Sequence, residues 1–419
     1  MTGGGPAADL PGGSGHENLP AAGYLGSRMA EAPVYLDHAA TTPVRPEVRE
    51  AMLPYLDLVF GNPSSAHRFG RAARAGLEQA RREVAESLGA DPAHVFFTSG
   101  GTEADNLAVI GAAEAARQQG RPRRVVVSAV EHKAVLAAAH HVAATGGSER
   151  LLPVDAGGRV ELDALDAALA EHAAVVSVMW VNNETGVVQP VEDVAARCQA
   201  AGVPYHTDAI QAVGKVPCGV RDLGITFLTI SGHKIGAPKG IGAIVVRTPT
   251  LVEPLVHGGG QQRGLRPGTE NVPGAVALGR AVALAVAEQA DFARRAAGLR
   301  DELAARLRAA VPDLLIAGEQ APRAPHVLTV LVPGADSEAL LMHLDLAGVA
   351  CSSGSACTTG SVEPSHVLTA MGVPRDLALG AVRFSLGRTT TASDVERAAA
   401  VFPRVVEKVR RLAGVLGRA

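Results

Sequence analysis

A single thiol, Cys357, lies in a segment made almost entirely of glycine and small hydroxyl residues. Residues 350–360 read Ala-Cys-Ser-Ser-Gly-Ser-Ala-Cys-Thr-Thr-Gly. Such residues bury little apolar surface and do not hold one backbone geometry. The composition therefore predicts a mobile loop that carries a nucleophilic thiol between two places. A free cysteine in a linker is the alternative, and this segment alone slightly favours it.

A second group of residues has the pattern of an anion site. Phe96-Phe97 precedes the run Thr98-Ser99-Gly100-Gly101-Thr102-Glu103, which predicts a strand, a glycine turn and the start of a helix. Free amides and the positive end of the helix dipole bind anions in that geometry, and Thr102 adds a hydroxyl. An ordinary helix cap explains these residues equally well.

Two further apolar runs end in residues that could complete a cofactor site. Ser231-Gly232-His233-Lys234 follows one run, and a desolvated lysine there can form a Schiff base, although most lysines are solvated surface charges. Asp208 and Gln211 follow another run, where a carboxylate can hold a ring nitrogen protonated and an amide can donate to a ring oxygen. A phosphate cradle, a Schiff-base lysine and a pyridinium partner are the three parts of a pyridoxal phosphate site.

Three other features fit the same chemistry. The imidazole of His132 follows a predicted strand and could stack on a cofactor ring. Asn182-Asn183-Glu184 ends another strand with side-chain donors. Arg383 is a charge within an apolar run, and a buried arginine needs an anion. A substrate carboxylate would satisfy it, and so would a structural Asp or Glu.

The elements that must position these residues lie between about residues 90 and 250. Short apolar runs alternate with helical patterns, which predicts a mostly parallel sheet covered on both faces. Ligands of such sheets bind at the carboxyl ends of the strands, where the motifs above fall. The predicted strands are 94–97, 124–128, 174–181, 203–206, 225–230 and 241–247, and the predicted helices are 102–118, 162–171 and 191–201.

After about residue 288 the pattern changes to that of a smaller α+β domain. Long amphipathic helices are predicted at 291–311 and 392–412, with apolar runs at 326–332 and 382–386 between them. The predicted division is a disordered extension at 1–30, a large domain at 46–287, and a small domain formed by 31–45 and 288–419. The small domain would carry the cysteine loop at about 350–364.

Composition excludes several classes of function. The 419 residues suffice for two domains, and the net charge of −3 argues against nucleic-acid binding. The four cysteines are too few and too scattered for a disulfide framework, which predicts a reducing cytoplasm. The longest apolar runs are shorter than the roughly 18–20 residues that a membrane helix needs.

From about Tyr35 to Val395 the chain resembles the cysteine desulfurases of the class V aminotransferase family. The fold that this resemblance implies is α/β, the fold-type I architecture of pyridoxal-phosphate-dependent transferases, with a mostly parallel seven-stranded sheet in the large domain. The motifs that carry the resemblance are 35–43, 61–67, 98–106, Glu131-His132, Asn182-Asn183-Glu184, 208–211, 231–234, 266–269 and 352–357.

The resemblance implies a role for each matching residue. Cys357, Lys234 and His132 match the catalytic residues, and Asn183 and Arg383 match the substrate-binding residues. Thr269 matches a phosphate ligand that the family supplies from the second subunit, which implies a homodimer. The implied cofactor contacts are Lys234, Gly101, Thr102, His132, Asn183, Asp208, Gln211, Ser231, His233 and Thr269.

The implied reaction converts L-cysteine to L-alanine and leaves a persulfide on Cys357. The sulfur acceptor would be an iron–sulfur scaffold protein, a tRNA-thiolation enzyme or both, with Cys357 as a transient iron–sulfur ligand and no mononuclear metal site. A selenocysteine lyase or another class V pyridoxal phosphate enzyme is the closest alternative. A non-catalytic sulfur carrier of the same fold would be expected to lose Lys234 or Cys357, and both are present.

Overall fold

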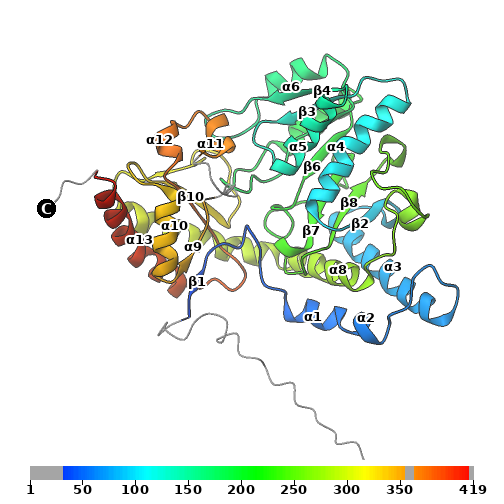
Figure 1. The fold of residues 1–419 in the computed structure, drawn as a ribbon, viewed down its shortest axis with the longest axis horizontal. Helices are drawn as coiled ribbons and strands as arrows, with labels where there is room; N and C mark the ends of the chain where they lie inside the picture. The colour runs from blue at the N-terminus through cyan, green and yellow to red at the C-terminus, as the bar shows by residue number, and fades with distance from the viewer. Residues whose placement is uncertain (1–31, 354–362, 415–419) are drawn as a thin grey trace, which may run out of the picture. The chain divides into compact units, whose positions relative to one another are not determined.

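The main sheet of the computed structural model has seven strands among the residues that the structure describes, 32–353 and 363–414 (Figure 1). Their order is β2-β8-β7-β6-β5-β3-β4, and only β8 runs against the other strands. This confirms the predicted mostly parallel seven-stranded sheet. The strands are β2 (Val95–Thr98), β3 (Arg124–Ser128), β4 (Ser148–Leu152), β5 (Val175–Ser177), β6 (Tyr205–Asp208), β7 (Phe227–Ser231) and β8 (Gly242–Val246).

Alternate residues of these strands pack against helices on the two faces of the sheet. Val125 and Val127 lie in one buried cluster with residues of α4 and α5, whereas Val126 lies in the other cluster, with residues of α3, α6, α7 and α8. This two-residue alternation is what a strand with two covered faces requires. The helices are α3 (Arg68–Leu88), α4 (Gly101–Gln118), α5 (Lys133–Ala144), α6 (Leu162–Leu169), α7 (Val191–Ala200) and α8 (Val272–Ala287).

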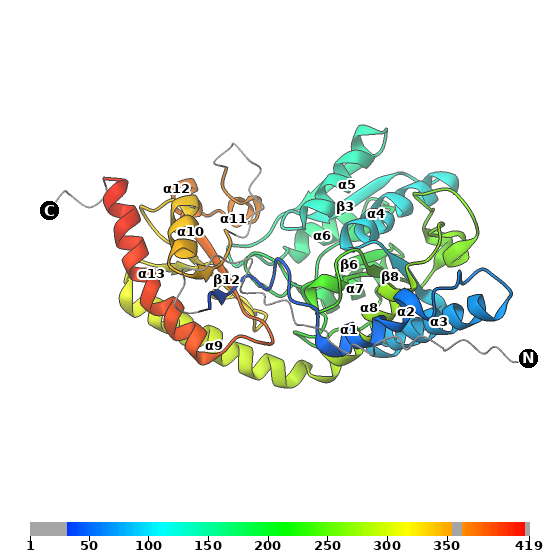
Figure 2. The ribbon, with the colours of Figure 1, turned by 60° about the horizontal axis from the view of Figure 1, so that its bottom comes forward.

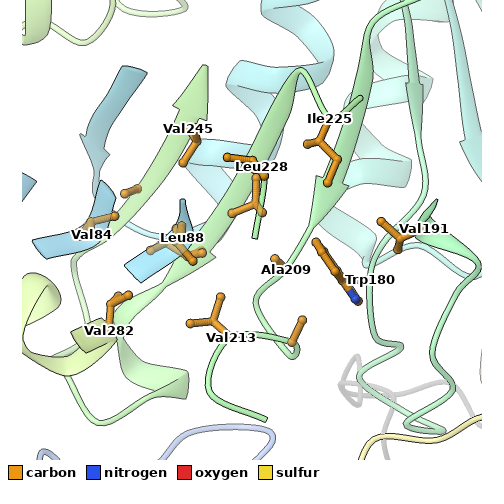
Figure 3. Close-up of a cluster of buried hydrophobic side chains, with 14 of the residues drawn as sticks. Val84, Leu88, Trp180, Val191, Ala209, Val213, Ile225, Leu228, Val245 and Val282 are labelled. Atoms are coloured by element: carbon orange, nitrogen blue, oxygen red, sulfur yellow. The ribbon is translucent and has the colours of Figure 1, made fainter. Parts of the chain in front are cut away.

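The larger of these clusters is shown in Figure 3. Val84 and Leu88 of α3 and Val282 of α8 are gathered there beside Leu228 and Val245, on two neighbouring strands. All five side chains are almost completely buried. The sheet is thus held rigidly by packing on this face, as the precise placement of side chains at its edge requires.

A second group of elements has its own antiparallel sheet (Figure 2). It also has its own buried cluster of apolar side chains. The sheet order is β12-β10-β9, and a separate two-stranded pairing joins β1 to β11 in parallel. Helices α9, α10 and α13 pack around this cluster. The elements are β1 (Val34–Tyr35), β9 (Leu315–Ile316), β10 (Val327–Leu331), β11 (Val349–Ala350), β12 (Ala381–Ser385), α9 (Gln289–Ala310), α10 (Ser337–Leu346) and α13 (Ala392–Leu412).

The remaining elements are short and connect these layers. Among the described residues, four of these elements are α-helices and four are 3₁₀ turns. They are α1 (Pro46–Met52), α2 (Pro54–Asp57), α11 (His366–Ala370), α12 (Arg375–Ala378), η2 (Pro92–His94), η3 (Gly232–Lys234), η4 (Pro249–Leu251) and η5 (Gln261–Gly264).

Several predicted boundaries differ from the observed ones. The predicted strand 174–181 is β5, which ends at Ser177 because the Met179 amide turns away to bond the Glu131 carboxylate. The predicted strand 203–206 lies two residues later in the structure, as β6. Strand β4 was not predicted, because its pattern Ser-Glu-Arg-Leu-Leu is polar and it lies at the sheet edge, where only Leu152 is buried.

The predicted change of domain near residue 288 falls between α8 and α9. The division into a large domain at 46–287 and a small domain at 31–45 and 288–419 stays a prediction. The predicted extension at 1–30 lies outside the described residues. Among the described helices, none combines the length and apolar composition needed to cross a bilayer.

Candidate active site

A cavity of about 390 Å³ opens at the carboxyl edge of the main sheet. All but two of the residues predicted to form the site line this cavity. Thr269 is absent from the lining, and Cys357 lies outside the described residues. The predicted residues that line it are Gly101, Thr102, His132, Asn183, Asp208, Gln211, Ser231, His233, Lys234 and Arg383.

Strand ends bring the polar residues together. Asp208 is the last residue of β6 and Ser231 the last residue of β7, and these two strands are parallel neighbours. The single turn η3 follows β7 directly and carries His233 and Lys234. Since the carboxyl ends of parallel strands meet at one edge, residues distant in sequence converge there.

The Lys234 amine is held by two backbone carbonyls. Its Nζ donates to the oxygens of Ala39 at 2.8 Å and Ala40 at 2.7 Å. Burial, with the charge of Arg383, lowers the pKa of Lys234 to about 8, against the opposing effects of Asp208 and Asp37. More of the amine is therefore neutral and nucleophilic near neutral pH than for an ordinary lysine.

Asp208 is a buried carboxylate that faces the cavity. Its Oδ1 accepts the Ile210 amide at 2.8 Å. Burial raises the pKa of Asp208, while His132 and Lys234 act in the opposite direction. A buried carboxylate is stable only beside a cation or a proton donor. The protonated ring nitrogen of pyridoxal phosphate would supply that donor, so this residue fits the predicted cofactor.

His132 is the N-cap of α5, and this position determines which of its ring nitrogens carries the hydrogen. Its Nδ1 accepts the Ala134 amide at 3.1 Å, so the neutral ring carries its hydrogen on Nε2. Burial lowers the pKa of His132, although Asp208 opposes that shift. A neutral imidazole at the cavity wall fits the predicted stacking on a cofactor ring.

The first turn of α4, where an anion cradle is predicted, lines the cavity through Gly101 and Thr102. Gly101 begins the helix, and a Cβ at this position would lie 2.2 Å from Cδ1 of Ile210. Only glycine therefore allows the start of α4 to pack this closely against Ile210. Thr102 and His233 also line the cavity, and the positive end of the eighteen-residue helix favours a phosphate.

Arg383 has one of the two anionic partners that its sequence left open. Its Nη2 pairs with the Asp37 carboxylate at 2.8 Å, and its Nη1 donates to the Asn183 carbonyl at 2.7 Å. Its buried Nε has no hydrogen-bond partner among the described residues. A structural aspartate is thus present, and the predicted substrate-carboxylate contact stays a prediction.

The two asparagines of the Asn182-Asn183-Glu184 motif have different surroundings. Asn182 donates from Nδ2 to the Val130 carbonyl at 2.9 Å, and its Oδ1 accepts the amides of Glu184 and Thr185. Its amide is thus used to hold the turn after β5. Asn183 is the member of the pair that lines the cavity.

A buried polar network below the cavity was not predicted. His206 contacts Ser177 Oγ through Nδ1 at 2.8 Å and Thr229 Oγ1 through Nε2 at 3.3 Å. Thr229 donates to Asp105 Oδ1 at 2.6 Å, and Asp105 Oδ2 has no partner among the described residues. Burial lowers the pKa of His206 to about 3 and raises the pKa of Asp105, with Asp208 adding to the latter shift.

Glu131 closes this network on its other side. It accepts the Met179 amide at 2.6 Å and the Ser177 hydroxyl at 3.4 Å, and burial with the Asp208 charge raises its pKa to about 8. His366, which was also not predicted, lines the cavity and donates from Nε2 to the Glu131 carbonyl at 2.9 Å. Glu131 belongs to the Glu131-His132 motif of the sequence, whereas the polar run Glu363-Pro364-Ser365 before His366 does not distinguish that residue.

Comparison with known proteins gives one consistent result. The family model described as Aminotransferase class-V matches residues 34–398. Cysteine desulfurase IscS of Dictyoglomus turgidum is 42% identical over 379 residues, which cover 90% of this chain and 96% of that protein. The solved structure titled NIFS-LIKE PROTEIN matches with a TM-score of 0.82 and 35% identity, over 92% of this chain and all of the other.

A second solved structure was determined with an amino acid bound. Its title is SspA in complex with cysteine. It matches with a TM-score of 0.74 and 32% identity, over 84% of this chain and 98% of that chain. The two structural matches support the same α/β architecture for the main sheet and its helices.

Proposed function

Because the chain belongs to the aminotransferase class-V family, which uses pyridoxal phosphate, we propose that it is a cysteine desulfurase. The proposed reaction converts L-cysteine to L-alanine and places the sulfur on Cys357. The observation that carries this proposal is the convergence of Lys234, Asp208 and the first turn of α4 on one cavity. The 42% identity to a named cysteine desulfurase supports the choice among class-V activities.

The cavity residues divide the work of holding the cofactor. Lys234 would bond its carbonyl carbon, and Asp208 would pair with its ring nitrogen. Gln211 would donate to the ring oxygen, while His132 would lie against the ring. The remaining predicted contacts, which would bind the phosphate or the substrate, are Gly101, Thr102, Ser231, His233 and Asn183.

When bound, pyridoxal phosphate supplies an electron sink for the bonds at the substrate's α carbon. The Lys234 amine, whose pKa is about 8, takes the α proton as general base. Asp208 would be held ionised by the ring nitrogen cation, which offsets the burial that raises its pKa, and would keep that nitrogen protonated. Arg383 holds the substrate carboxylate through its Nε, which has no partner among the described residues, while Asp37 holds Nη2.

Sulfur transfer is assigned to Cys357 on the strength of its sequence context. Its thiolate attacks the substrate sulfur, the carbon–sulfur bond breaks, and the electron pair returns to carbon, which is protonated to give alanine. The sulfur then leaves as a persulfide for an acceptor. We propose an iron–sulfur scaffold or a tRNA-thiolation enzyme as that acceptor, with Cys357 as a transient iron–sulfur ligand during delivery.

We further propose a homodimer in which Thr269 completes the phosphate site of the second subunit. Its absence from the cavity of its own chain supports this arrangement. A reducing cytoplasm is the proposed compartment, since Cys198, Cys218 and Cys351 are all free thiols in the structure.

The test measures alanine formed from L-cysteine together with the absorption of bound pyridoxal phosphate. Lys234→Ala should abolish turnover and alter the cofactor band. Cys357→Ser should abolish turnover and leave the band unchanged, whereas Cys351→Ser, the matched control, should retain activity. Normal desulfuration by Cys357→Ser would refute the assigned nucleophile. A strong preference for selenocysteine over cysteine would favour the selenocysteine lyase alternative.

A further inference from the structure

The amide of Gln211 is committed at both of its ends. Its Nε2 donates to the Ala39 carbonyl at 2.9 Å, and its Oε1 contacts His326 Nε2 at 3.1 Å. A carbonyl oxygen only accepts, so Ala39 fixes which end of the amide is the NH₂ group. The oxygen end must then accept, and His326 must donate from Nε2.

His326 is well suited to that single task. It is 1% exposed and lies just before β10, so its ring is held by the surrounding packing. Its other nitrogen, Nδ1, is buried without a partner among the described residues. Burial and the nearby charges of Lys215 and Arg383 lower the pKa of His326 well below its usual value. The ring is therefore neutral and carries its one hydrogen on Nε2.

This arrangement leaves one hydrogen of Gln211 unused. An amide NH₂ has two hydrogens, and Ala39 accepts one of them. Gln211 also lines the cavity, where the proposed function places the cofactor's ring oxygen. The same Ala39 carbonyl accepts the Lys234 amine at 2.8 Å, so this oxygen links the amide to the proposed catalytic lysine.

We propose that His326 is a positioning residue that holds the Gln211 amide with its N–H toward the cofactor's ring oxygen. The inference rests on the proposed function, because that oxygen belongs to pyridoxal phosphate. Without His326 the buried Gln211 oxygen loses its donor, and a half-turn of the amide would present an acceptor to Ala39 and to the ring oxygen together. A purely structural role, in which His326 packs beside Phe292, is the rival explanation.

The experiment compares His326→Gln with His326→Met. A glutamine amide reaches about as far as the imidazole Nε2 and keeps a donor there, whereas methionine is of similar size and has none. His326→Asn, whose shorter amide reaches only the position of Nδ1, is a second variant if methionine does not fold. Each is made in the wild type and in a Gln211→Met background. The readouts are the dissociation constant of pyridoxal phosphate from the protein and the absorption maximum of the bound cofactor.

We expect His326→Met to weaken pyridoxal phosphate binding by about three- to tenfold and to shift the absorption maximum, as loss of one buried hydrogen bond would. His326→Gln should restore both values. In the Gln211→Met background, His326→Met should have almost no further effect. Equal losses in the methionine and glutamine variants, or an undiminished loss without Gln211, would overturn the proposal in favour of packing.

A binding measurement on the wild-type protein distinguishes failure of this proposal from failure of the proposed function on which it rests. If the wild type does not bind pyridoxal phosphate, the proposed function fails and the role of His326 falls with it. If the wild type binds it and the variants behave alike, only the role of His326 is refuted.

Discussion

Hydrogen bonds with backbone groups determine which ring nitrogen of His132 and of His366 carries the hydrogen. His132 accepts a backbone amide at Nδ1, and His366 donates from Nε2 to the Glu131 carbonyl, so each neutral ring carries its hydrogen on Nε2. The two rings therefore differ in what they offer the cavity. Among the described residues, His132 keeps an Nε2–H that can donate, whereas His366 keeps an Nδ1 that can accept a hydrogen bond. A histidine in a sequence does not reveal this difference.

The raised pKa of Glu131 predicts how stability depends on pH. Its pKa is about 8 in the folded protein, against 4.5 for an unperturbed glutamate, so between these values the unfolded chain releases a proton that the folded chain keeps. The stability contributed by this group therefore falls as pH rises through that window. Glu131→Gln removes the titration and retains an oxygen for the Met179 amide.

Urea unfolding at about pH 5 and at about pH 8 tests this prediction. The free energy of unfolding of Glu131→Gln, relative to the wild type, should rise between the two conditions by on the order of 1–3 kcal/mol. A difference that stays constant across the two conditions would show that Glu131 is ionised in the folded protein.

Two consecutive glycines stand at the start of helix α4. Their surroundings differ. A Cβ on Gly101 would lie 2.2 Å from Cδ1 of Ile210, whereas a Cβ on Gly100 would meet nothing within 4 Å. Ile210 and Gly101 both line the cavity, and Gly100 does not. The two positions thus form a matched pair for testing the phosphate cradle.

Gly101→Ala should weaken pyridoxal phosphate binding, because the new methyl pushes Ile210 into the cavity or shifts the helix start. We expect a loss of about tenfold, which corresponds to about 1.4 kcal/mol and lies within the range for overpacking. Gly100→Ala should have little effect, and neither change should matter for pyridoxal without its phosphate. Titration of both ligands checks this, and an equal loss for pyridoxal would place the defect outside the phosphate cradle.

An element could be predicted when its signals lie within its own sequence, and it was missed or misplaced when it depends on distant partners. Helix α13 was predicted with its observed bounds, since its apolar stripe and the capping box of Thr391 and Asp394 are local signals. Strand β4 was missed because its pairing with β3 at the sheet edge depends on the partner strand. Strand β5 was predicted too long because the bond from Met179 to Glu131 ends it.

The residues of the site show the same difference between local and long-range signals. The convergence of Lys234, Asp208 and Gly101 could be predicted because each follows a strand in a recognisable order, and all three line one cavity, while their roles stay predictions. Asp105 and His326 were missed because their own sequence surroundings do not distinguish them from other polar residues of the chain. Their partners Thr229 and Gln211 are distant in sequence, so the pairings exist only in the folded chain.

In the described part of the molecule, five large apolar side chains are exposed between the end of α1 and the start of α3. Exposed apolar side chains of this size, close together in sequence, commonly mark protein contacts. A second copy of the chain is the occupant that the proposed homodimer supplies. The exposed residues are Leu53, Leu56, Leu58, Phe60 and Phe69.

The loop that carries Thr269 is tied to the phosphate cradle of its own chain but does not enter it. Arg266 pairs with Glu103, in the first turn of α4, at 2.8 Å, and Thr269 is still absent from the cavity lining. If Thr269 acts across a dimer interface, each active site is built from two chains. A site of that kind can be restored by combining two chains that are each inactive.

Differently tagged Lys234→Ala and Thr269→Ala chains, co-expressed and purified as the mixed dimer, test this arrangement. In a shared site, the Thr269→Ala chain keeps its own Lys234 and receives Thr269 from its partner, so one of two sites is complete. The mixed dimer should then show about half of the wild-type rate, while each parent dimer stays impaired. If Thr269 acted within its own chain, both sites would lack one group and mixing would restore nothing. A protein that elutes as a monomer would equally contradict the shared site.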